Sequence, residues 1–309
     1  MKKILITGAA GNVGSALVER LLTYGEYHVV AVDNFLTGSK SKLPVHSPTN
    51  FTFIKADVNN YYEISSIMLA YKFDFVFHYA AVVGVQRTLE NPVLVLEDIQ
   101  GIKNILDLSK NTGVTRVFYS SSSEVYGEPV EFPQNEKTTP LNSRLPYAVV
   151  KNVGESFLRS YHKEYSLNYT IFRFFNTYGP RQSEDFVVSK FLKQALSNQP
   201  ITIYGEGAQT RTFCFIDDNI DTTIACLQKN FCVNDVMNVG NDEEVMIKDL
   251  AEKVIKATGG SSSIKFLPAL TEGDMTRRRP DNSKMRAILN RPLISLEEGL
   301  KRTIEKRMF

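Results

Sequence analysis

The stretch KKILITGAAGNVG, residues 2–14, opens the chain with a short apolar run followed by three glycines spaced three residues apart. In a strand-turn-helix unit, Gly8 permits the tight turn, Gly11 lets the backbone approach a pyrophosphate, and Gly14 allows helix and strand to pack closely. The N-terminus of the following helix offers free N–H groups to phosphate. Asp33 ends the next apolar run, where a carboxylate accepts hydrogen bonds from both ribose hydroxyls. The stretch therefore predicts a dinucleotide-binding unit.

Outward from this unit, short apolar runs rich in β-branched residues alternate with helical patterns. The expected strands are KKILITG, HVVAVD, FTFIKAD, FDFVFHYA, TRVFYSS and LNYTIFRFF, and the expected helices cover residues 12–24, 60–70, 91–112 and 145–165. This alternation indicates a parallel sheet with helices on both faces, and each strand is apolar nearly throughout, as expected where both faces are covered. We therefore expect an α/β fold with a Rossmann-type, doubly wound parallel sheet.

The alternation loosens after residue 175, where turn-rich stretches such as NTYGPRQSED, IYGEGAQ and GGSSS separate the apolar runs. This change predicts a smaller second lobe. The stretch FCFIDDNIDTTIACL, residues 213–227, resembles another strand and helix that return to the main sheet. We expect a dinucleotide-binding domain at 1–175 plus about 213–235, and a substrate-binding lobe at 176–212 and 236–309.

Composition narrows the class of ligand and the compartment. The net charge is +2 with both signs interspersed, so the sequence favours a small-molecule ligand over nucleic acid or an anionic membrane. No apolar run is long enough to span a bilayer, and the chain does not begin like a signal peptide. Cys214, Cys226 and Cys232 form no CxxC pair, which fits a reducing compartment and gives no indication of a metal site. We expect a cytoplasmic protein.

Two stretches carry the candidate chemistry. Tyr147 and Lys151 are four residues apart, which places both on one face of the helix that begins at Pro146. An ammonium beside a phenol favours the phenolate, so the pair can serve as a general base near neutral pH. Taken alone, the pair could also be a surface aromatic with a snorkelling lysine. However, the serines of 120–123 and Glu124 follow the fifth strand at the sheet edge where open α/β folds bind ligands.

The cofactor is expected to be NAD. A carboxylate at Asp33 repels the 2′-phosphate of NADP, and no arginine adjoins it. Asp57 and Val58 end the third strand, where they could contact the adenine, although an aspartate at a strand end is also a common turn former.

The chain resembles the extended short-chain dehydrogenase/reductase superfamily and, within it, the nucleotide-sugar epimerase/dehydratase family. The matching stretches span residues 1 to about 290: TGAAGNVG, VDNFLTG, FHYAAVVGV, SSSSEVYGE, PYAVVK, FRFFNTYGPRQ, QTRTFCFIDD and GDMTRRRPD. The resemblance implies tightly held NAD, a catalytic trio of Ser122, Tyr147 and Lys151, and a second lobe that binds a nucleotide sugar. It also implies a homodimer formed through the helices near 91–112 and 145–165.

The same resemblance implies the rest of the site. Cofactor contacts are expected from Gly8, Gly11, Asn12, Val13, Gly14, Asp33, Asn34, Asp57, Val58, Ala80, Ala81, Tyr147 and Lys151. Substrate contacts are expected from Ser122, Ser123, Glu124, Asn176, Val188, Tyr204, Arg211 and Arg278. Independently of the family, the planar fork of arginine suits a diphosphate, and residues 277–279 form the chain's arginine triplet, which could otherwise be a solvated basic loop.

The reaction itself divides the family. Its members begin when the tyrosine takes the proton of the sugar's 4-hydroxyl and NAD takes the hydride from C4. Glu124 lies where related decarboxylases and dehydratases carry a glutamate, whereas Ser123 replaces the aspartate of dehydratases. Residues 80–85 resemble epimerases and lack the proline-containing segment of decarboxylases. We expect a 4-epimerase of a UDP-hexose or UDP-hexuronic acid, with UDP-glucuronate decarboxylase or 4,6-dehydratase as alternatives.

Two residues depart from the family pattern. Asp98 lies where many relatives carry asparagine, and Val83 lies where some epimerases place a lysine near the cofactor. A non-catalytic NAD-binding sensor is a further alternative, but such proteins usually lack the tyrosine or the lysine, and both Tyr147 and Lys151 are present. The catalytic interpretation is therefore favoured.

Overall fold

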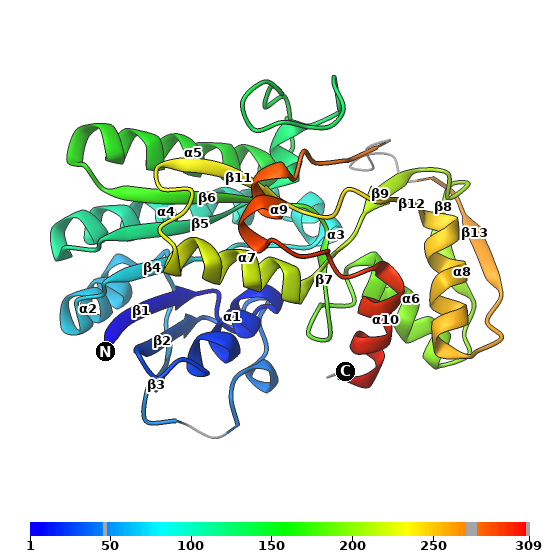
Figure 1. Cartoon of the computed structure of the whole chain (residues 1–309), viewed down its shortest axis with the longest axis horizontal. Helices are drawn as coiled ribbons and strands as arrows, with labels where there is room; N and C mark the ends of the chain where they lie inside the picture. The colour runs from blue at the N-terminus through cyan, green and yellow to red at the C-terminus, as the bar shows by residue number, and fades with distance from the viewer. Residues whose placement is uncertain (46–47, 270–276, 307–309) are drawn as a thin grey trace.

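The computed structural model describes residues 1–45, 48–269 and 277–306, which form a larger and a smaller lobe (Figure 1). Seven strands form one parallel sheet in the larger lobe, in the order β11-β6-β5-β4-β1-β2-β3. The strands are β1 Lys2–Thr7, β2 Tyr27–Asp33, β3 Phe51–Lys55, β4 Phe75–His78, β5 Arg116–Ser122, β6 Asn168–Phe174 and β11 Asp235–Val239. The expected Rossmann-type sheet is confirmed.

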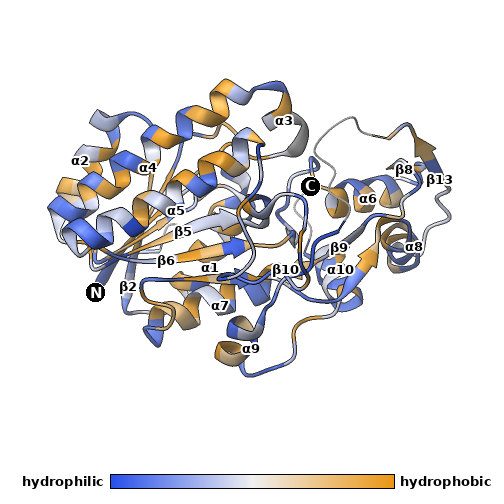
Figure 2. Cartoon of the chain, turned by 90° about the horizontal axis from the view of Figure 1, so that it is seen from above, coloured by the Kyte–Doolittle hydropathy of each residue, from blue (hydrophilic) through white to orange (hydrophobic). Residues whose placement is uncertain are grey.

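Helices cover both faces of this sheet, as its apolar strands require (Figure 2). One face packs against α1 Asn12–Leu22 and α7 Ile216–Gln228, and the other against α2 Tyr61–Tyr71, α4 Pro92–Thr112 and α5 Pro146–Tyr165. Each face has its own apolar cluster, and strand residues such as Ile4 and Val30 are fully buried. The four helices predicted from the sequence therefore lie at the predicted positions.

The smaller lobe is built from short elements. Its helices are α6 Val187–Leu196, α8 Ile247–Thr258 and α10 Leu296–Glu305, and its strand pairs are β8 Ile201–Tyr204 with β13 Ile264–Leu267 and β9 Thr210–Thr212 with β12 Glu244–Met246. Three further short helices are α3 Val85–Glu90, α9 Ser283–Leu289 and the 3₁₀ turn η2 Ser123–Tyr126. Because η2 follows β5 and α3 follows β4, both lie beyond the carboxyl ends of strands of the main sheet.

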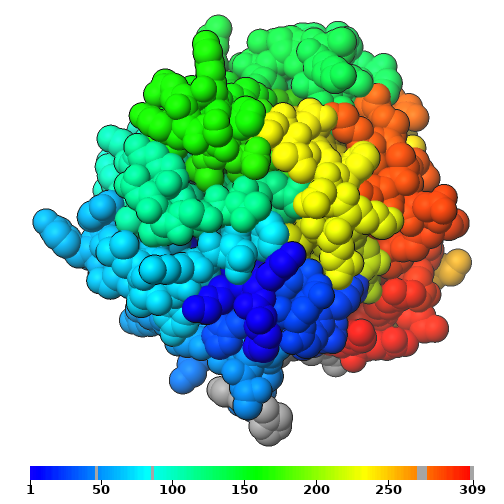
Figure 3. Space-filling model, turned by 60° about the vertical axis from the view of Figure 1, so that its left-hand side comes forward, coloured from blue at the N-terminus to red at the C-terminus, as the bar shows by residue number. Residues whose placement is uncertain are grey.

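One expected strand lies elsewhere. The strand predicted at the start of 213–227 is β10 Cys214–Phe215, which pairs with β7 Thr177–Tyr178 and not with the main sheet. The main sheet instead gains β11, beside β6, beyond the expected boundary near 235. In Figure 3 the yellow segment that contains β11 lies on the same face as the blue start of the chain. Short strands carry little pattern, so their partners are set by tertiary packing.

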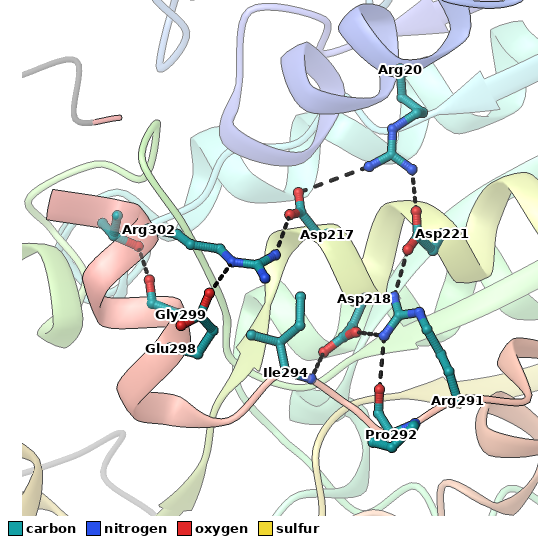
Figure 4. A network of polar contacts seen from close by, with 11 residues as sticks. Arg20, Asp217, Asp218, Asp221, Arg291, Pro292, Ile294, Glu298, Gly299 and Arg302 are labelled. Atoms are coloured by element: carbon teal, nitrogen blue, oxygen red, sulfur yellow. Dashed lines mark hydrogen bonds and ion pairs between the residues drawn. The ribbon is translucent and has the colours of Figure 1, made fainter. Parts of the chain in front are cut away.

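A network of charged residues connects α1, α7 and α10 (Figure 4). Arg20 of α1 forms ion pairs with Asp217 and Asp221 of α7, and Asp217 also pairs with Arg302 of α10 at 3.4 Å. Arg291, in the segment between α9 and α10, pairs with Asp221 at 2.5 Å. These side chains are partly exposed, so each pair contributes modestly to stability. Together they attach the C-terminal helix to the helix that follows the glycine-rich turn.

Across residues 1–45, 48–269 and 277–306, we find no helix with the length and apolar character needed to cross a bilayer. The same ranges contain no cluster of three or more His, Cys, Asp or Glu side chains suited to a metal ion.

Candidate active site

The glycine-rich turn connects β1 to α1 with the close contacts that the sequence predicted. Gly8 has a left-handed φ of 66°, and a Cβ there would lie 2.6 Å from the backbone nitrogen of Ala80. A Cβ at Gly14 would lie 2.2 Å from the carbonyl oxygen of Gly8. Among the described residues, no side chain caps the start of α1, and an uncapped helix N-terminus is suited to bind phosphate.

Asp33 is held at the end of β2 by two backbone amides. Its Oδ2 accepts a hydrogen bond from the nitrogen of Ala10 at 2.9 Å, and its Oδ1 accepts one from the nitrogen of Phe35 at 2.8 Å. Asn34 donates to Oδ2 of Asp57 at 3.1 Å, which brings together predicted cofactor residues from β2 and β3. The buried carboxylate beside the glycine-rich turn fits the adenosine half of NAD.

The three predicted catalytic residues meet at the carboxyl end of β5. Ser122 is the last residue of β5, and Tyr147 lies in the first turn of α5 behind Pro146. Lys151 lies one turn further, with its Nζ 5.6 Å from the centre of the Tyr147 ring and 3.4 Å from Oγ of Ser120. The structure therefore places a phenol, an ammonium and serine hydroxyls together at the carboxyl edge of the sheet, the same edge that carries the glycine-rich turn.

The pKa of Tyr147 shifts in the direction opposite to the sequence-based expectation, which was a phenolate favoured by Lys151. Burial raises the pKa of Tyr147 above its ordinary value, and the charge of Glu124 raises it further. Ser122 and Arg278 act in the other direction, but with smaller effect. These groups alone keep the phenol protonated at neutral pH. The positive charge of a bound nicotinamide ring would favour the phenolate.

Burial of the protonated Lys151 side chain destabilises the folded protein. Burial lowers the pKa of Lys151 to about 8, and the carboxylate of Asp98 opposes this shift. The unfolded chain keeps the proton up to about pH 10.5, whereas the folded chain releases it from about pH 8. The loss of folding free energy is therefore largest below about pH 8 and decreases as the pH rises towards about 10.5.

Lys151→Met is accordingly expected to raise the free energy of unfolding at pH 7, by up to about 3 kcal/mol, while turnover is lost. The gain should shrink between pH 8 and pH 10. Denaturant unfolding of the wild type and the variant at pH 7 and at pH 10 measures this gain in the free energy of unfolding. Lys163→Met is the matched control, because Lys163 is exposed on the same helix and should change stability little. A Lys151→Met protein no more stable than wild type at pH 7 would contradict this interpretation.

Glu124 and Arg278, predicted separately for the substrate, form an ion pair with Nη1 of Arg278 2.7 Å from Oε1 of Glu124. The arginine side chain is 5% exposed and the glutamate side chain 21% exposed. The neighbouring Arg277 instead pairs with Glu244 at 2.5 Å and covers the ring of Phe132. The arginine triplet therefore has one member in the site and one on the surface of the smaller lobe.

The other predicted substrate residues lie partly in the smaller lobe and partly in the segments that follow β5 and β6. Asn176 adopts a positive φ of 36° between β6 and β7 and donates to the carbonyl oxygen of Thr212 at 3.0 Å. Arg211 is buried in β9, and Val188 is buried in the first turn of α6. Tyr204, at the end of β8, is 39% exposed. Ser123 begins η2 and is buried beside Ser122. Their roles towards a substrate stay predictions.

Three charged residues near the site were not assigned a role from the sequence. Asp98 of α4 accepts a hydrogen bond from the nitrogen of Val82 at 2.7 Å and interacts with the charge of Lys151. Glu155 and Arg173 form an ion pair in the core behind the site. The sequence carried a signal for both: Glu155 follows Lys151 by four residues, and Arg173 interrupts an apolar strand.

Comparison with known proteins agrees with this geometry. Residues 4–240 match the model of the NAD dependent epimerase/dehydratase family. A curated relative, UDP-glucuronic acid decarboxylase 1 of Arabidopsis thaliana, is 37% identical over 98% of this chain and 69% of its own length.

Solved structures show the same fold over nearly the whole chain. The UDP-glucose 4-epimerase of Thermotoga maritima with UDP-glucose gives a TM-score of 0.92 at 30% identity, covering 98% of both chains. The UDP-glucuronic acid 4-epimerase of Bacillus cereus, in complex with UDP-glucuronic acid and NAD, gives 0.89 at 33% identity and covers 98% of both chains.

Proposed function

Because the chain belongs to the NAD-dependent epimerase/dehydratase family, we propose that it oxidises C4 of UDP-glucuronic acid and then releases the C6 carboxylate as carbon dioxide. The chain itself is an NAD-dependent enzyme of nucleotide-sugar metabolism. UDP-glucuronic acid is named both for the Arabidopsis decarboxylase and for the Bacillus cereus epimerase. A UDP-hexuronic acid is therefore the substrate class that both groups of relatives support.

In the proposed first step, Tyr147 accepts the proton of the 4-hydroxyl while Ser122 hydrogen-bonds the same oxygen. Lys151 supplies positive charge beside the phenolate, at 5.6 Å from the ring centre. NAD, which the glycine-rich turn and Asp33 would hold, would supply the acceptor for the C4 hydride and its later return to C4. The side chains of the chain thus hold the hydroxyl and move its proton.

The 4-keto sugar formed in this step is a β-keto acid. When its C5–C6 bond breaks, carbon dioxide leaves and the electron pair becomes an enolate on the C4 oxygen. A proton from solvent water is then added at C5, C4 is reduced again, and Tyr147 returns its proton to the C4 oxygen. The product is a UDP-pentose.

The Glu124–Arg278 ion pair is the observation that favours decarboxylation as the proposed reaction. Arg278 is buried and positively charged, so it can receive a sugar carboxylate, and Glu124 lies 2.7 Å from it. A substrate carboxylate held there lies close to a second carboxylate, and this repulsion favours its departure as neutral carbon dioxide. Decarboxylation is therefore proposed ahead of 4-epimerisation, whereas the sequence-based expectation placed 4-epimerisation first.

The second candidate is 4-epimerisation of the same UDP-hexuronic acid. It is favoured by residues 80–85, which resemble epimerases and follow β4 at the carboxyl edge of the sheet. This segment lies near Lys151, because the Val82 nitrogen donates a hydrogen bond to Asp98, and the charge of Asp98 interacts with Lys151. Dehydration is disfavoured by Ser123, which offers no acid.

The products distinguish the candidates when the protein, NAD and UDP-glucuronic acid are incubated in D₂O and followed by proton NMR. We expect carbon dioxide and a UDP-pentose that carries deuterium at C5. Epimerisation would instead give the 4-epimer with its C5 proton retained. Absence of both products would contradict the proposed function.

Glu124→Gln tests the role of the ion pair in the same assay. It is expected to slow carbon dioxide release on the order of 100-fold, so that the 4-keto sugar or the 4-epimer accumulates. Glu128→Gln, in the exposed loop after η2, is the control and should behave as wild type. Equal rates of carbon dioxide release in the two variants would remove Glu124 from the mechanism.

A further inference from the structure

We infer that Glu155 and Arg173 are a positioning pair for the reaction, because their buried ion pair fixes α5 against β6 and the hydrogen bond from Ser121 to Glu155 fixes α5 against β5, next to Ser122. This inference rests on the proposed function. Tyr147, Lys151 and Glu155 follow one another at intervals of four residues, so all three lie along one face of α5. The pair therefore acts on the same helix face that carries the phenol and the ammonium.

The ion pair has the planar, two-point geometry that fixes both partners. Nε of Arg173 lies 2.8 Å from Oε1 of Glu155, and Nη2 lies 2.7 Å from Oε2. The two side chains are 2% and 0% exposed. Burial raises the pKa of Glu155, but the hydrogen bonds and charge of Arg173 lower it to below its ordinary value, so the carboxylate stays charged. Such a pair tolerates little displacement.

On the helix side, the pair sets where α5 lies along β5. Ser121 of β5 donates its hydroxyl to Oε1 of Glu155 at 2.7 Å, and Ser122 is the next residue of the strand. A Cβ at Gly154 would lie 2.3 Å from Oη of Tyr119, so the helix backbone packs directly against the side chain of Tyr119, a residue of β5. A shift of α5 along the strand would therefore break the contact of Glu155 with Ser121.

On the strand side, the same guanidinium fixes the turn that carries Glu124. Nη1 of Arg173 donates to Oη of Tyr126 at 2.8 Å, and that hydroxyl donates to Oδ1 of Asn238 at 2.7 Å. Tyr126 ends η2, the 3₁₀ turn in which Glu124 lies. The pair thus joins β6 to α5, β5 and η2, and the last three elements supply Tyr147, Lys151, Ser122 and Glu124.

Removal of both charges together tests the inference without leaving either one unpaired. The double variant Glu155→Gln, Arg173→Met is expected to stay folded, since replacement of a complete buried pair by neutral groups is often close to neutral for stability. We expect kcat to fall on the order of 10- to 100-fold, because small misplacements of reacting groups have effects of this size. KM and the affinity for NAD should stay within about twofold of wild type. A kcat within twofold of wild type, or a change confined to KM, would overturn the inference.

Arg159→Met is the matched control. Arg159 also pairs with Glu155, at 2.9 Å, but it is 43% exposed on the solvent side and leaves the Arg173 contact in place. Its kcat should equal that of wild type. If the double variant does not fold, Ser121→Ala decides the question: a several-fold fall in kcat at unchanged thermal stability supports the inference, and an unchanged kcat overturns it.

Failure of the proposed function is distinguishable from failure of this inference. If wild-type protein does not convert UDP-glucuronic acid, amide hydrogen exchange of the NAD-bound double variant provides the answer. Faster exchange in residues 146–152 than in wild type supports the positioning role, and equal exchange there overturns it.

Discussion

Tyr147→Phe is expected to lower turnover of UDP-glucuronic acid by about 1,000-fold or more while NAD binding is retained. The substitution removes only the hydroxyl that takes and returns the proton of the 4-hydroxyl, a contribution within the range of general acid–base catalysis. The ring stays in place, so its contact with Lys151, 5.6 Å from the ring centre, is preserved. Chemistry should therefore be lost without loss of the fold.

Steady-state rates and NAD titration of the same preparation measure the two effects separately. Tyr165→Phe is the control, because Tyr165 lies at the end of the same helix and is 51% exposed. Its rates should equal those of wild type. Turnover within tenfold of wild type for Tyr147→Phe would show that another group takes the proton.

Gly14→Ala is expected to weaken NAD binding by about 100-fold or more and to lower stability by about 1–3 kcal/mol. The added Cβ would lie 2.2 Å from the carbonyl oxygen of Gly8 and 2.9 Å from its carbonyl carbon. Both neighbours are backbone atoms, so the turn itself must move, and with it the N–H groups that face the pyrophosphate.

Titration with NAD and thermal unfolding measure these effects. Gly25→Ala is the matched control, since a Cβ there would meet no atom within 4 Å. It should leave both quantities close to wild type. An NAD affinity of Gly14→Ala within threefold of wild type would mean that the turn does not hold the pyrophosphate.

The fold could be predicted from the sequence where its signal is local. Strands buried on both faces contain short apolar runs, such as residues 4–6 and 117–119, and each is followed by a recognisable helix. The partner of a short strand depends on distant residues. For this reason β10 was assigned to the wrong sheet, and β11 was not recognised as the seventh strand.

The site shows the same division. The spacing of Gly8, Gly11 and Gly14 and the four-residue interval between Tyr147 and Lys151 are local, and both point to chemistry directly. The direction of the Tyr147 pKa shift is not local, because it follows from burial and from the charge of Glu124.

Contacts between residues that are distant in the sequence could not be predicted either. Glu124 was identified by resemblance, but its ion pair with Arg278 depends on how the smaller lobe folds over the sheet. Likewise, Arg173 inside an apolar strand signals a buried partner, but only the tertiary structure identifies that partner as Glu155.

The central claim is that this site oxidises C4 and later returns the same hydride to C4. The most direct test is incubation of the NAD-loaded protein with UDP-glucuronic acid that carries deuterium at C4, followed by NMR and mass analysis of the product. We expect a UDP-pentose that retains the deuterium at C4. A product that has lost this deuterium, or no product at all, would contradict it.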